Sequence, residues 1–418
     1  MSAPYLALQL RPVLPAQEPP TWAGSVWVGE VWRDTVDSFE RKSQTTGLPI
    51  RCELDGSAGY RTARLLVRSA GRTHGFIDLD VHDGLVDFDT LKADVSGALD
   101  ATGTPAAEPA ARRPRTVTVV ICTRNRPAML RTALESVLAV QFGDFDVIVV
   151  DNASSTDETA DYVRGVSDPR VRLVVEPRPG LSRARNAALR AATTDVVAFV
   201  DDDVVVDPHW LDALTAAFDH APSVSCVSGT VPAGEIRTPT QADFDRRVHW
   251  SASFAPRVFD WDEPPGDIPL FPFAVGEYGT GANFAVDRAW VLSLGGFDEN
   301  LGAGAPTQGG EDIDMFFRVL HSRRRLVHEP AAIVWHRHRD TEDDLNAQMR
   351  GYGLGLGAWL SKIATNPVTA VLAVKTALTR ARALRRHLGG PSLEIAPAMV
   401  LRGAWIYQRA RLSGWIRR

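Results

Sequence analysis

The chain has 418 residues, 44% hydrophobic and 23% charged, which is the composition of a globular protein of about two or three domains. The net charge is −5, yet residues 345–418 carry 12 Lys and Arg against one acidic residue, so the remainder of the chain is acidic. No apolar run reaches the roughly 18 residues of a membrane span, and the N-terminus lacks the pattern of a secretory signal. These features argue against a membrane-spanning, secreted or nucleic-acid-binding protein.

The cysteines and the charge distribution bear on where the protein works. Cys52, Cys122 and Cys226 are far apart in the chain and follow no metal-binding spacing. We therefore expect buried thiols in a reducing compartment and a cytoplasmic protein. The basic tail suggests a segment that meets an anionic surface, such as the inner face of a membrane.

Residues 1–100 are expected to form a small, β-rich domain of the α+β class. Val and Trp alternate in 24–32, and 62–81 have the pattern of two strands joined by a Gly-containing turn. Residues 101–115 are rich in Ala, Pro and Arg and indicate a linker. We find no catalytic constellation before this linker, so presentation of an acceptor and self-association both stay open as its task.

After the linker, strands and helices alternate. This order predicts an α/β fold with a mostly parallel sheet and helices on both faces. The expected strands are 117–122, 145–151, 171–176, 195–200 and 223–229, and the expected helices between them are 126–140, 154–166 and 180–192.

Polar residues follow four of these strands, and the ends of parallel strands meet at one edge of a sheet. Asp201, Asp202 and Asp203 come directly after a buried strand, and Asp151 ends another. Adjacent carboxylates repel one another unless positive charge lies among them. An open loop before a helix capped by Asp207 is the simpler interpretation, but it leaves the three carboxylates unexplained.

The remaining strand ends supply the complementary chemistry. An Arg side chain suits a diphosphate, because its planar guanidinium pairs with two oxygens. A carboxylate such as Asp151 suits a nucleobase N–H or a ribose hydroxyl, and a carboxylate such as Asp203 suits Mg²⁺ or Mn²⁺. The other polar residues at these ends are Thr123, Arg124, Arg126, Arg183, Arg185 and Asn186.

The stretches VTVVICTRNRP, VIVVDNASSTDET and PGLSRARNAALRAATTDVVAFVDDDVVVDPHWL resemble the family 2 glycosyltransferases of the GT-A fold. The resemblance covers residues 116–340. It implies that Asp201 and Asp203 form the Asp-any-Asp metal motif, with Asp202 beside the nucleotide. It further implies that the nucleotide is contacted by Thr123, Arg124, Arg126, Asp151, Arg183 and Asn186.

The second half of this region completes the implied site. In the family, the segment matching 279–301 lines the donor-sugar and acceptor pocket, and the aspartate of an acidic pair is the general base, which implies Asp312 next to Glu311. Helix capping is the alternative for this pair, although it leaves Gly309 and Gly310 unexplained. A histidine after a terminal strand often completes the metal shell, which implies His336; a histidine merely hydrogen-bonded at a strand end is the alternative.

The resemblance implies an inverting, metal-dependent glycosyltransferase with Mn²⁺ or Mg²⁺ and a UDP-, dTDP- or GDP-linked sugar donor. The acceptor can be a glycan, a lipid-linked molecule or a small molecule. The Gln-any-any-Arg-Trp motif of processive members is missing, which favours single addition. A nucleotidyltransferase and a non-catalytic nucleotide-sugar binding module are the alternatives, and CTRNRP lacks the Gly and Lys of a typical nucleotidyltransferase phosphate loop.

Residues 341–418 are expected to form a basic helical region. Its candidate helices are 345–388, interrupted near Asn366 and Pro367, and 398–417. The composition of the second helix suits a peripheral contact with anionic lipid, and a packed helix with a solvated basic face is the alternative. Its large apolar residues are Trp405, Ile406, Leu412, Trp415 and Ile416.

Overall fold

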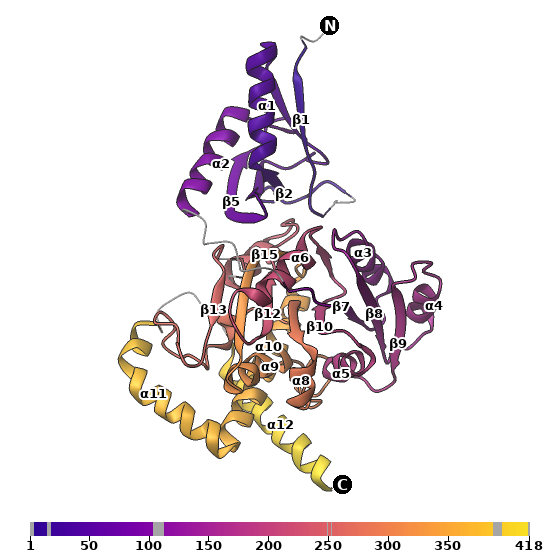
Figure 1. The fold of residues 1–418 in the computed structure, drawn as a ribbon, viewed down its shortest axis with the longest axis vertical. Coiled ribbons are helices and arrows are strands. Elements are labelled where there is room, and N and C mark those ends of the chain that lie inside the picture. Colours follow the sequence, from indigo (N-terminus) through magenta and orange to yellow (C-terminus); the bar gives the residue numbers. More distant parts are fainter. Residues whose placement is uncertain are drawn as a thin grey trace.

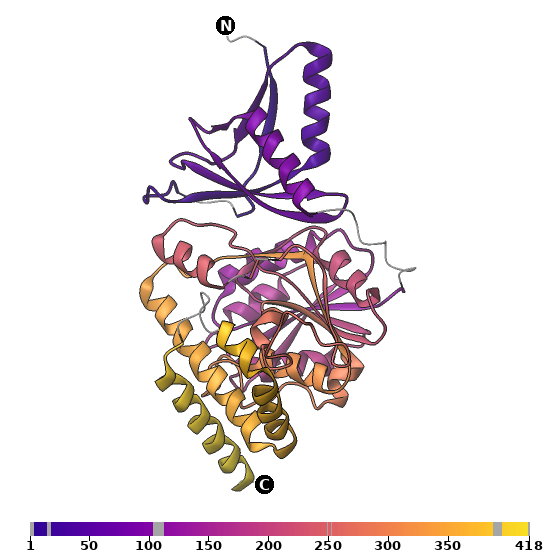
Figure 2. The ribbon, with the colours of Figure 1, turned by 90° about the vertical axis from the view of Figure 1, so that its left-hand side faces the viewer.

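The computed structural model describes residues 4–14, 18–102, 113–248, 250–251, 253–387 and 395–416. An N-terminal unit lies at one end of a central α/β layer, and the C-terminal helices lie at the other end (Figures 1 and 2). Most of the expected linker, residues 103–112, lies outside the described residues.

The N-terminal unit contains two three-stranded sheets within the described residues, with orders β1-β3-β6 and β2-β4-β5. Its buried residues, among them Trp27, Leu65 and Leu91, form a hydrophobic cluster of their own. The elements are β1 (Leu6–Leu10), β2 (Val26–Trp32), α1 (Arg33–Thr46), β3 (Ile50–Leu54), β4 (Thr62–Ser69), β5 (Arg72–Asp80), β6 (Leu85–Val86) and α2 (Phe88–Thr102).

The central sheet confirms the α/β fold that the sequence predicts. Its parallel part has the order β10-β7-β8-β9, and helices α3 to α5 connect these strands. The elements are β7 (Val117–Thr123), α3 (Pro127–Leu138), β8 (Phe145–Asn152), α4 (Glu158–Arg164), β9 (Val171–Glu176), α5 (Leu181–Ala191) and β10 (Val196–Val200).

The other half of the sheet is more mixed than expected, because β14 runs antiparallel to both β10 and β12. β15 pairs parallel with β12 and antiparallel with β11 and β13. The elements of this half are β11 (Val204–Val206), α6 (Trp210–Ala216), η1 (Ala217–Asp219), β12 (Val224–Thr230), α7 (Pro239–Val248), β13 (Arg257–Phe259), η2 (Val275–Tyr278), β14 (Asn283–Asp287), α8 (Arg288–Ser293), α9 (Glu311–His321) and β15 (Arg325–His336).

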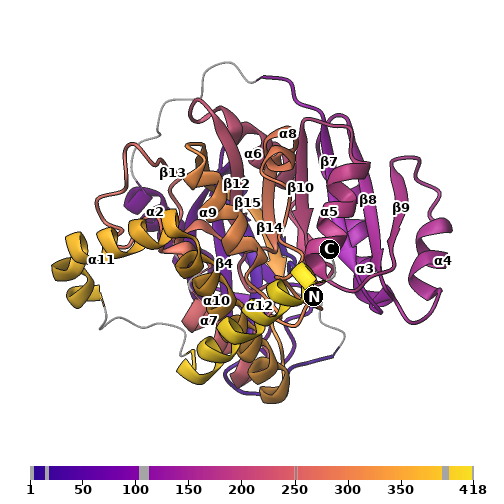
Figure 3. The ribbon, with the colours of Figure 1, turned by 90° about the horizontal axis from the view of Figure 1, so that it is seen from below.

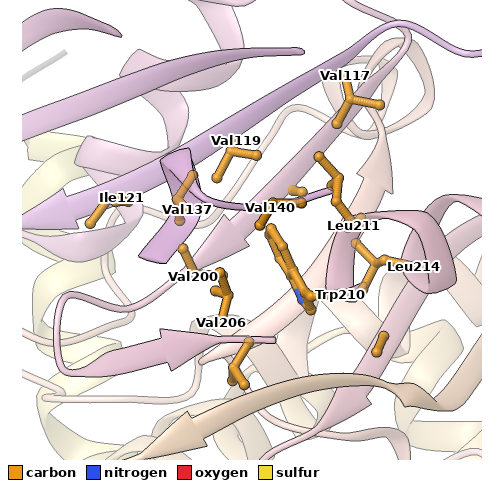
Figure 4. Close-up of a cluster of buried hydrophobic side chains, with 14 of the residues drawn as sticks. Val117, Val119, Ile121, Val137, Val140, Val200, Val206, Trp210, Leu211 and Leu214 are labelled. Carbon is orange, nitrogen blue, oxygen red and sulfur yellow. The ribbon is translucent and has the colours of Figure 1, made fainter. Parts of the chain in front are cut away.

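Alternate residues of the central strands enter two hydrophobic clusters on opposite faces of the sheet. Val119 and Ile121 join the cluster around Trp210, whereas Val120 faces the cluster around α5 (Figure 4). The Trp210 indole donates a hydrogen bond to Asn283 Oδ1 at 2.8 Å, so its one polar atom is satisfied within the core. Both faces are covered, which explains the near-continuous apolar strands of the sequence.

A buried ion pair joins the N-terminal unit to the central sheet. The Arg68 guanidinium of β4 binds the Asp207 carboxylate, with Nη2 to Oδ1 at 3.2 Å, and both side chains are 1% exposed. Asp207 also accepts the backbone N–H of His209. The expected helix cap at Asp207 is therefore wrong: α6 begins at Trp210, and the carboxylate instead neutralises a buried cation.

Three helices follow the sheet, α10 (Glu342–Thr365), α11 (Pro367–His387) and α12 (Pro397–Ile416), and the predicted interruption at Asn366 and Pro367 is confirmed. Residue 388 and the side chains of Trp415 and Ile416 lie outside the described part of the chain. Across the described residues, every helix is too short or too polar to span a bilayer.

Glycines on α10 allow close contacts on two faces of this helix, and α12 crosses one of them (Figure 3). A Cβ at Gly357 would lie 1.9 Å from the Val400 carbonyl oxygen of α12, and one at Gly355 would lie 2.5 Å from the Gly309 carbonyl carbon. The helix therefore holds α12 on one side and the Gly309–Gly310 loop before α9 on the other.

We expect Gly357→Ala to lower the free energy of unfolding by about 1–3 kcal/mol, because the new methyl group would overlap backbone that cannot rotate away. The matched control is Gly97→Ala in α2, where a Cβ meets no described atom within 4 Å. That control should raise stability by about 0.5–1 kcal/mol. Urea unfolding of both variants tests this, and a Gly357→Ala protein as stable as the control would contradict the packing.

Candidate active site

The register of the parallel strands brings three loops to one edge of the sheet. Val200 at the end of β10 pairs with Ile121, and Thr123 at the end of β7 pairs with Asp151. The Asp201–Asp203 segment leaves β10 at this edge. The backbone pairing of these strands therefore brings the polar strand ends together, as expected from the sequence.

The acidic segment is tied to the loop after β7. Thr123 donates its hydroxyl to Asp202 Oδ2 at 2.7 Å, and Arg126 Nη1 donates to Asp202 Oδ1 at 3.1 Å. Asp202 is buried, and burial and Asp203 raise the pKa of its carboxyl against the opposing effect of Arg126 and Thr123. Thr123 and Asp202 thus hold two loops of the site together.

Asp203 lies among three basic side chains. Its Oδ1 is 3.5 Å from His336 Nε2, and its Oδ2 is 3.2 Å from Arg339 Nη2 and 3.7 Å from Arg126 Nη1. Burial opposes ionisation, but His336 and the two guanidinium groups outweigh it and lower the pKa of Asp203. The carboxylate is charged at neutral pH and available to a cation.

A buried guanidinium connects the acidic segment to α9. Arg185 is 2% exposed; its Nη1 is 3.1 Å from Glu311 Oε1 and its Nη2 is 3.5 Å from Asp201 Oδ1. Nη2 also donates to the Gly281 carbonyl at 2.8 Å. The rings of Phe199, Phe284 and Phe297 surround it, with centroids 5.2–5.7 Å from the guanidinium carbon.

Two carboxylates of this cluster are harder to ionise than usual. Burial and the neighbouring Asp203 and Asp202 raise the pKa of Asp201 to about 7, against the opposing charge of Arg185. Burial and Asp312 raise the pKa of Glu311 to about 7, again against Arg185. Arg185 therefore lies between two negative groups, one on the acidic segment and one on α9.

Asp312 is held at the start of α9 and is less buried than Glu311. Its Oδ2 accepts the Gly281 N–H at 2.9 Å, and its Oδ1 accepts the Ile313 N–H at 2.8 Å. The N-cap of α9 is Gly310, in the left-handed region with φ +89°, and no side chain caps the helix. Neither Glu311 nor Asp312 is therefore the N-cap residue of α9, although Asp312 accepts one N–H of its first turn.

Other residues implied by the resemblance lie near this edge but are engaged elsewhere. Arg183 faces Glu299 at 3.6 Å, and Asn186 bonds both backbone groups of Phe297. Asp151 accepts a hydrogen bond from the Ser154 hydroxyl. Arg124 is exposed and donates to the Ala153 carbonyl at 3.2 Å.

Sequence reasoning missed the roles of Arg185 and Arg339. The signal for Arg185 was available, because it lies on the same face of α5 as Ala184, Ala188 and Leu189, and a charged residue on an apolar helix face needs a buried partner. Arg339 follows β15 in an irregular segment, where no periodicity indicates the direction of its side chain.

The donor set fits a divalent cation with oxygen and imidazole ligands. Asp203 Oδ1 and His336 Nε2 face each other at 3.5 Å, both side chains are nearly buried, and Asp201 adds a third donor from the same loop. The fit is one of donor chemistry: within the described residues, no group of three or more His, Cys, Asp or Glu side chains is placed so that it could hold a metal ion.

Comparison with known proteins identifies relatives. A model of the family Glycosyl transferase family 2 matches residues 118–276. The pre-mycofactocin glycosyltransferase of Mycobacterium tuberculosis is 31% identical over 257 residues, 61% of this chain and 50% of that protein. The glucosyl-dolichyl phosphate glucuronosyltransferase of Haloferax volcanii is 30% identical over 191 residues, 44% of this chain and 57% of that protein. The chain thus spans about half the length of these relatives.

A solved structure is also similar, that of the mannosyltransferase PcManGT from Pyrobaculum calidifontis in complex with GDP-Man and Mn²⁺. It covers 76% of this chain and 81% of that chain, with 20% identity and a TM-score of 0.46. The family match ends before Glu311, Asp312 and His336, so these three residues lie outside the matched segment.

We expect Arg185→Met to lower the free energy of unfolding by about 3–5 kcal/mol at pH 8, because it leaves the buried Glu311 carboxylate without a cation and removes the partner of the partly exposed Asp201. With a pKa of about 7, Glu311 is neutral at pH 5, so the loss should be smaller there. Urea unfolding at both pH values measures it. Arg183→Met on the same helix is the control, and equal, pH-independent losses in the two variants would count against this role for Arg185.

Proposed function

Residues 118–276 carry the family 2 glycosyltransferase sequence, and from this premise we propose that the protein transfers a sugar from a nucleotide-diphosphate donor to an acceptor hydroxyl. The observation that carries the proposal is the meeting of Asp201, Asp203, Arg185 and Asp312 at one edge of the sheet. Such an edge is where open α/β sheets bind nucleotides.

In this proposal Asp312 is the general base. The N–H groups of Gly281 and Ile313 orient its carboxylate at the N-terminus of α9. As the acceptor oxygen forms its bond to the anomeric carbon, Asp312 takes the hydroxyl proton. The bond between the anomeric carbon and the diphosphate oxygen breaks, and its electron pair leaves with the diphosphate. A single displacement of this kind inverts the anomeric centre.

The departing diphosphate is bound on the opposite side of the cleft. Arg126 and Arg339, which flank Asp203, are partly exposed and can pair with its oxygens. Asp203, Asp201 and His336 would hold Mn²⁺ or Mg²⁺, which when bound supplies positive charge to the leaving group. Thr123, Asp151 and Arg124 belong to the nucleotide side in this proposal, because they lie at the ends of β7 and β8.

A nucleotidyltransferase and a non-catalytic nucleotide-sugar binding module are the two alternative functions for this edge of the sheet. A nucleotidyltransferase typically uses a Gly-rich, Lys-bearing phosphate loop, which CTRNRP is not, and a binding module needs no base at all. Arg185 pairs with the buried Glu311 carboxylate and not with the half-buried Asp312. This arrangement favours a site in which the Asp312 carboxylate acts as the base. The donor sugar and its base, UDP-, dTDP- or GDP-linked, stay predictions.

We further propose that the acceptor side faces an anionic lipid surface, as a lipid-linked acceptor would require. Leu401, Trp405 and Leu412 of α12 are 60–73% exposed and fall within an arc of about 40° on the helix. Arg402 and Arg409 lie together on one side of this arc, and residues 367–387 and 397–416 contain no Asp or Glu. A cytoplasmic location with peripheral membrane contact stays a prediction, as does self-association.

We expect Asp312→Asn to lower kcat by about 10²–10⁴-fold, because the amide cannot accept the acceptor proton. Donor affinity should stay within about threefold of wild type, because the amide keeps the shape of the carboxylate. A panel of UDP-, dTDP- and GDP-sugars with Mn²⁺ first identifies the donor by thermal shift. Asp343→Asn, an exposed carboxylate of α10, is the control, and an Asp312→Asn protein with normal kcat would remove Asp312 from this role.

Membrane contact is tested by co-sedimentation with vesicles. The wild type should bind vesicles that contain phosphatidylglycerol and leave pure phosphatidylcholine in the supernatant. Leu401→Ser with Trp405→Ser should weaken binding at least about tenfold, because two exposed apolar side chains lose their burial in lipid. Val175→Ser, an exposed apolar residue of β9, should change nothing. Equal binding to both lipids, or by both variants, would refute the contact.

A further inference from the structure

A continuous series of polar contacts runs from the acidic segment into the N-terminal unit. His336 Nδ1 is 3.0 Å from His338 Nδ1, and His338 Nε2 is 3.5 Å from Asp245 Oδ1 on α7. Asp245 Oδ2 in turn accepts a hydrogen bond from Arg64 Nη1 at 3.2 Å. Arg64 belongs to β4, so the series crosses from one structural unit to the other, beginning beside Asp203.

The two histidines are enclosed by side chains that leave them little freedom. His338 is buried, and its ring packs edge-on against Phe244 of α7 and Trp250. His336 also packs edge-on against Trp250, and its backbone N–H and carbonyl both bond the segment after β12. The ring positions are therefore fixed by packing, and only the placement of the protons on their nitrogens is left to the polar contacts.

The charge of Asp245 selects that placement. A carboxylate facing His338 Nε2 favours the tautomer with the proton on Nε2, which leaves a lone pair on Nδ1. That lone pair then accepts the Nδ1 proton of His336. The opposite arrangement would direct a nitrogen lone pair at the Asp245 carboxylate. It is disfavoured once a cation lies between His336 Nε2 and Asp203 Oδ1, because the cation relieves the equivalent repulsion at the other end of the series.

With its proton on Nδ1, His336 directs the lone pair of Nε2 toward Asp203 Oδ1, 3.5 Å away. Two electron-rich atoms that face each other at this distance repel unless a cation lies between them. The contacts around His338 therefore prepare His336 as a metal ligand.

We propose that His338 and Asp245 are positioning residues that hold His336 in its metal-binding tautomer, and that Arg64 links this arrangement to the N-terminal unit. The proposal rests on the metal site of the proposed function. Arg64 also pairs with Asp78, at 2.8 and 3.0 Å, which fixes its guanidinium in front of Asp245. The N-terminal unit would in this way set the metal affinity of a site that it does not enter.

The experiment measures binding of Mn²⁺ to the full-length protein by electron paramagnetic resonance, with the metal alone and with UDP, GDP or dTDP. Asp203→Ala and His336→Ala should abolish binding in every condition that shows it for the wild type. His338→Ala and Asp245→Asn should weaken Mn²⁺ affinity about 10–100-fold, as loss of outer-shell partners does. Arg64→Gln should weaken it several-fold.

Two further variants separate positioning from general damage. His338→Gln should recover part of the affinity, because its carbonyl oxygen can accept the His336 Nδ1 proton. Asp243→Asn, an exposed carboxylate on the same helix, should bind Mn²⁺ like the wild type. In turnover assays, kcat of Asp245→Asn should return to the wild-type value at saturating Mn²⁺, whereas a distorted site would keep a low kcat.

The outcomes distinguish this proposal from the one on which it rests. Normal Mn²⁺ affinity in Asp245→Asn and His338→Ala, with loss in His336→Ala, overturns the positioning role and leaves the metal site intact. No Mn²⁺ binding by the wild type in any condition overturns both the positioning role and the metal dependence. Donor binding measured without metal then still tests the transferase activity separately.

Discussion

The architecture of the site depends on one buried cation. Arg185 carries its charge into a ring of phenylalanines, where it would be unstable without the carboxylates of Asp201 and Glu311 and the carbonyl of Gly281. Those carboxylates come from different halves of the sheet, and each would be unstable there without Arg185. The acidic segment and the start of α9 are thus held together through Arg185, because the buried Glu311 and Arg185 have little water to replace each other.

The sequence foretold the parts of this arrangement that depend on local pattern. Buried strands that end in polar residues predict a ligand-binding edge of the sheet. Asp201, Asp202 and Asp203 stand out because adjacent carboxylates repel one another unless positive charge lies among them. Ion pairs between residues far apart in the chain have no such pattern in the sequence. Arg68 and Asp207, 139 positions apart, look like a surface strand residue and a helix cap until the tertiary structure brings them together. The antiparallel β14 was hidden for the same reason, since strand direction depends on the path of the preceding chain.

Support for the site comes from both ends of the chain. The N-terminal unit contributes Arg64 and Arg68, which bind carboxylates on α7 and after β11. The C-terminal helices contribute the glycine face of α10, and Tyr407 of α12 reaches Asp298 at 2.9 Å. The candidate site itself is built from the middle of the sequence, and the flanking regions contact it by packing and by ion pairs.

The close approach of Gly355 to Gly309 and Gly310 has a practical consequence for dissecting the protein. A fragment ending at residue 340, where the resemblance stops, would retain every carboxylate and histidine of the cleft. It would lack the helix against which the turn before Glu311 rests, so that turn would sample many shapes. The smallest fragment that folds on its own should therefore be sought by shortening the full chain stepwise from its termini, and α10 should be kept in every fragment.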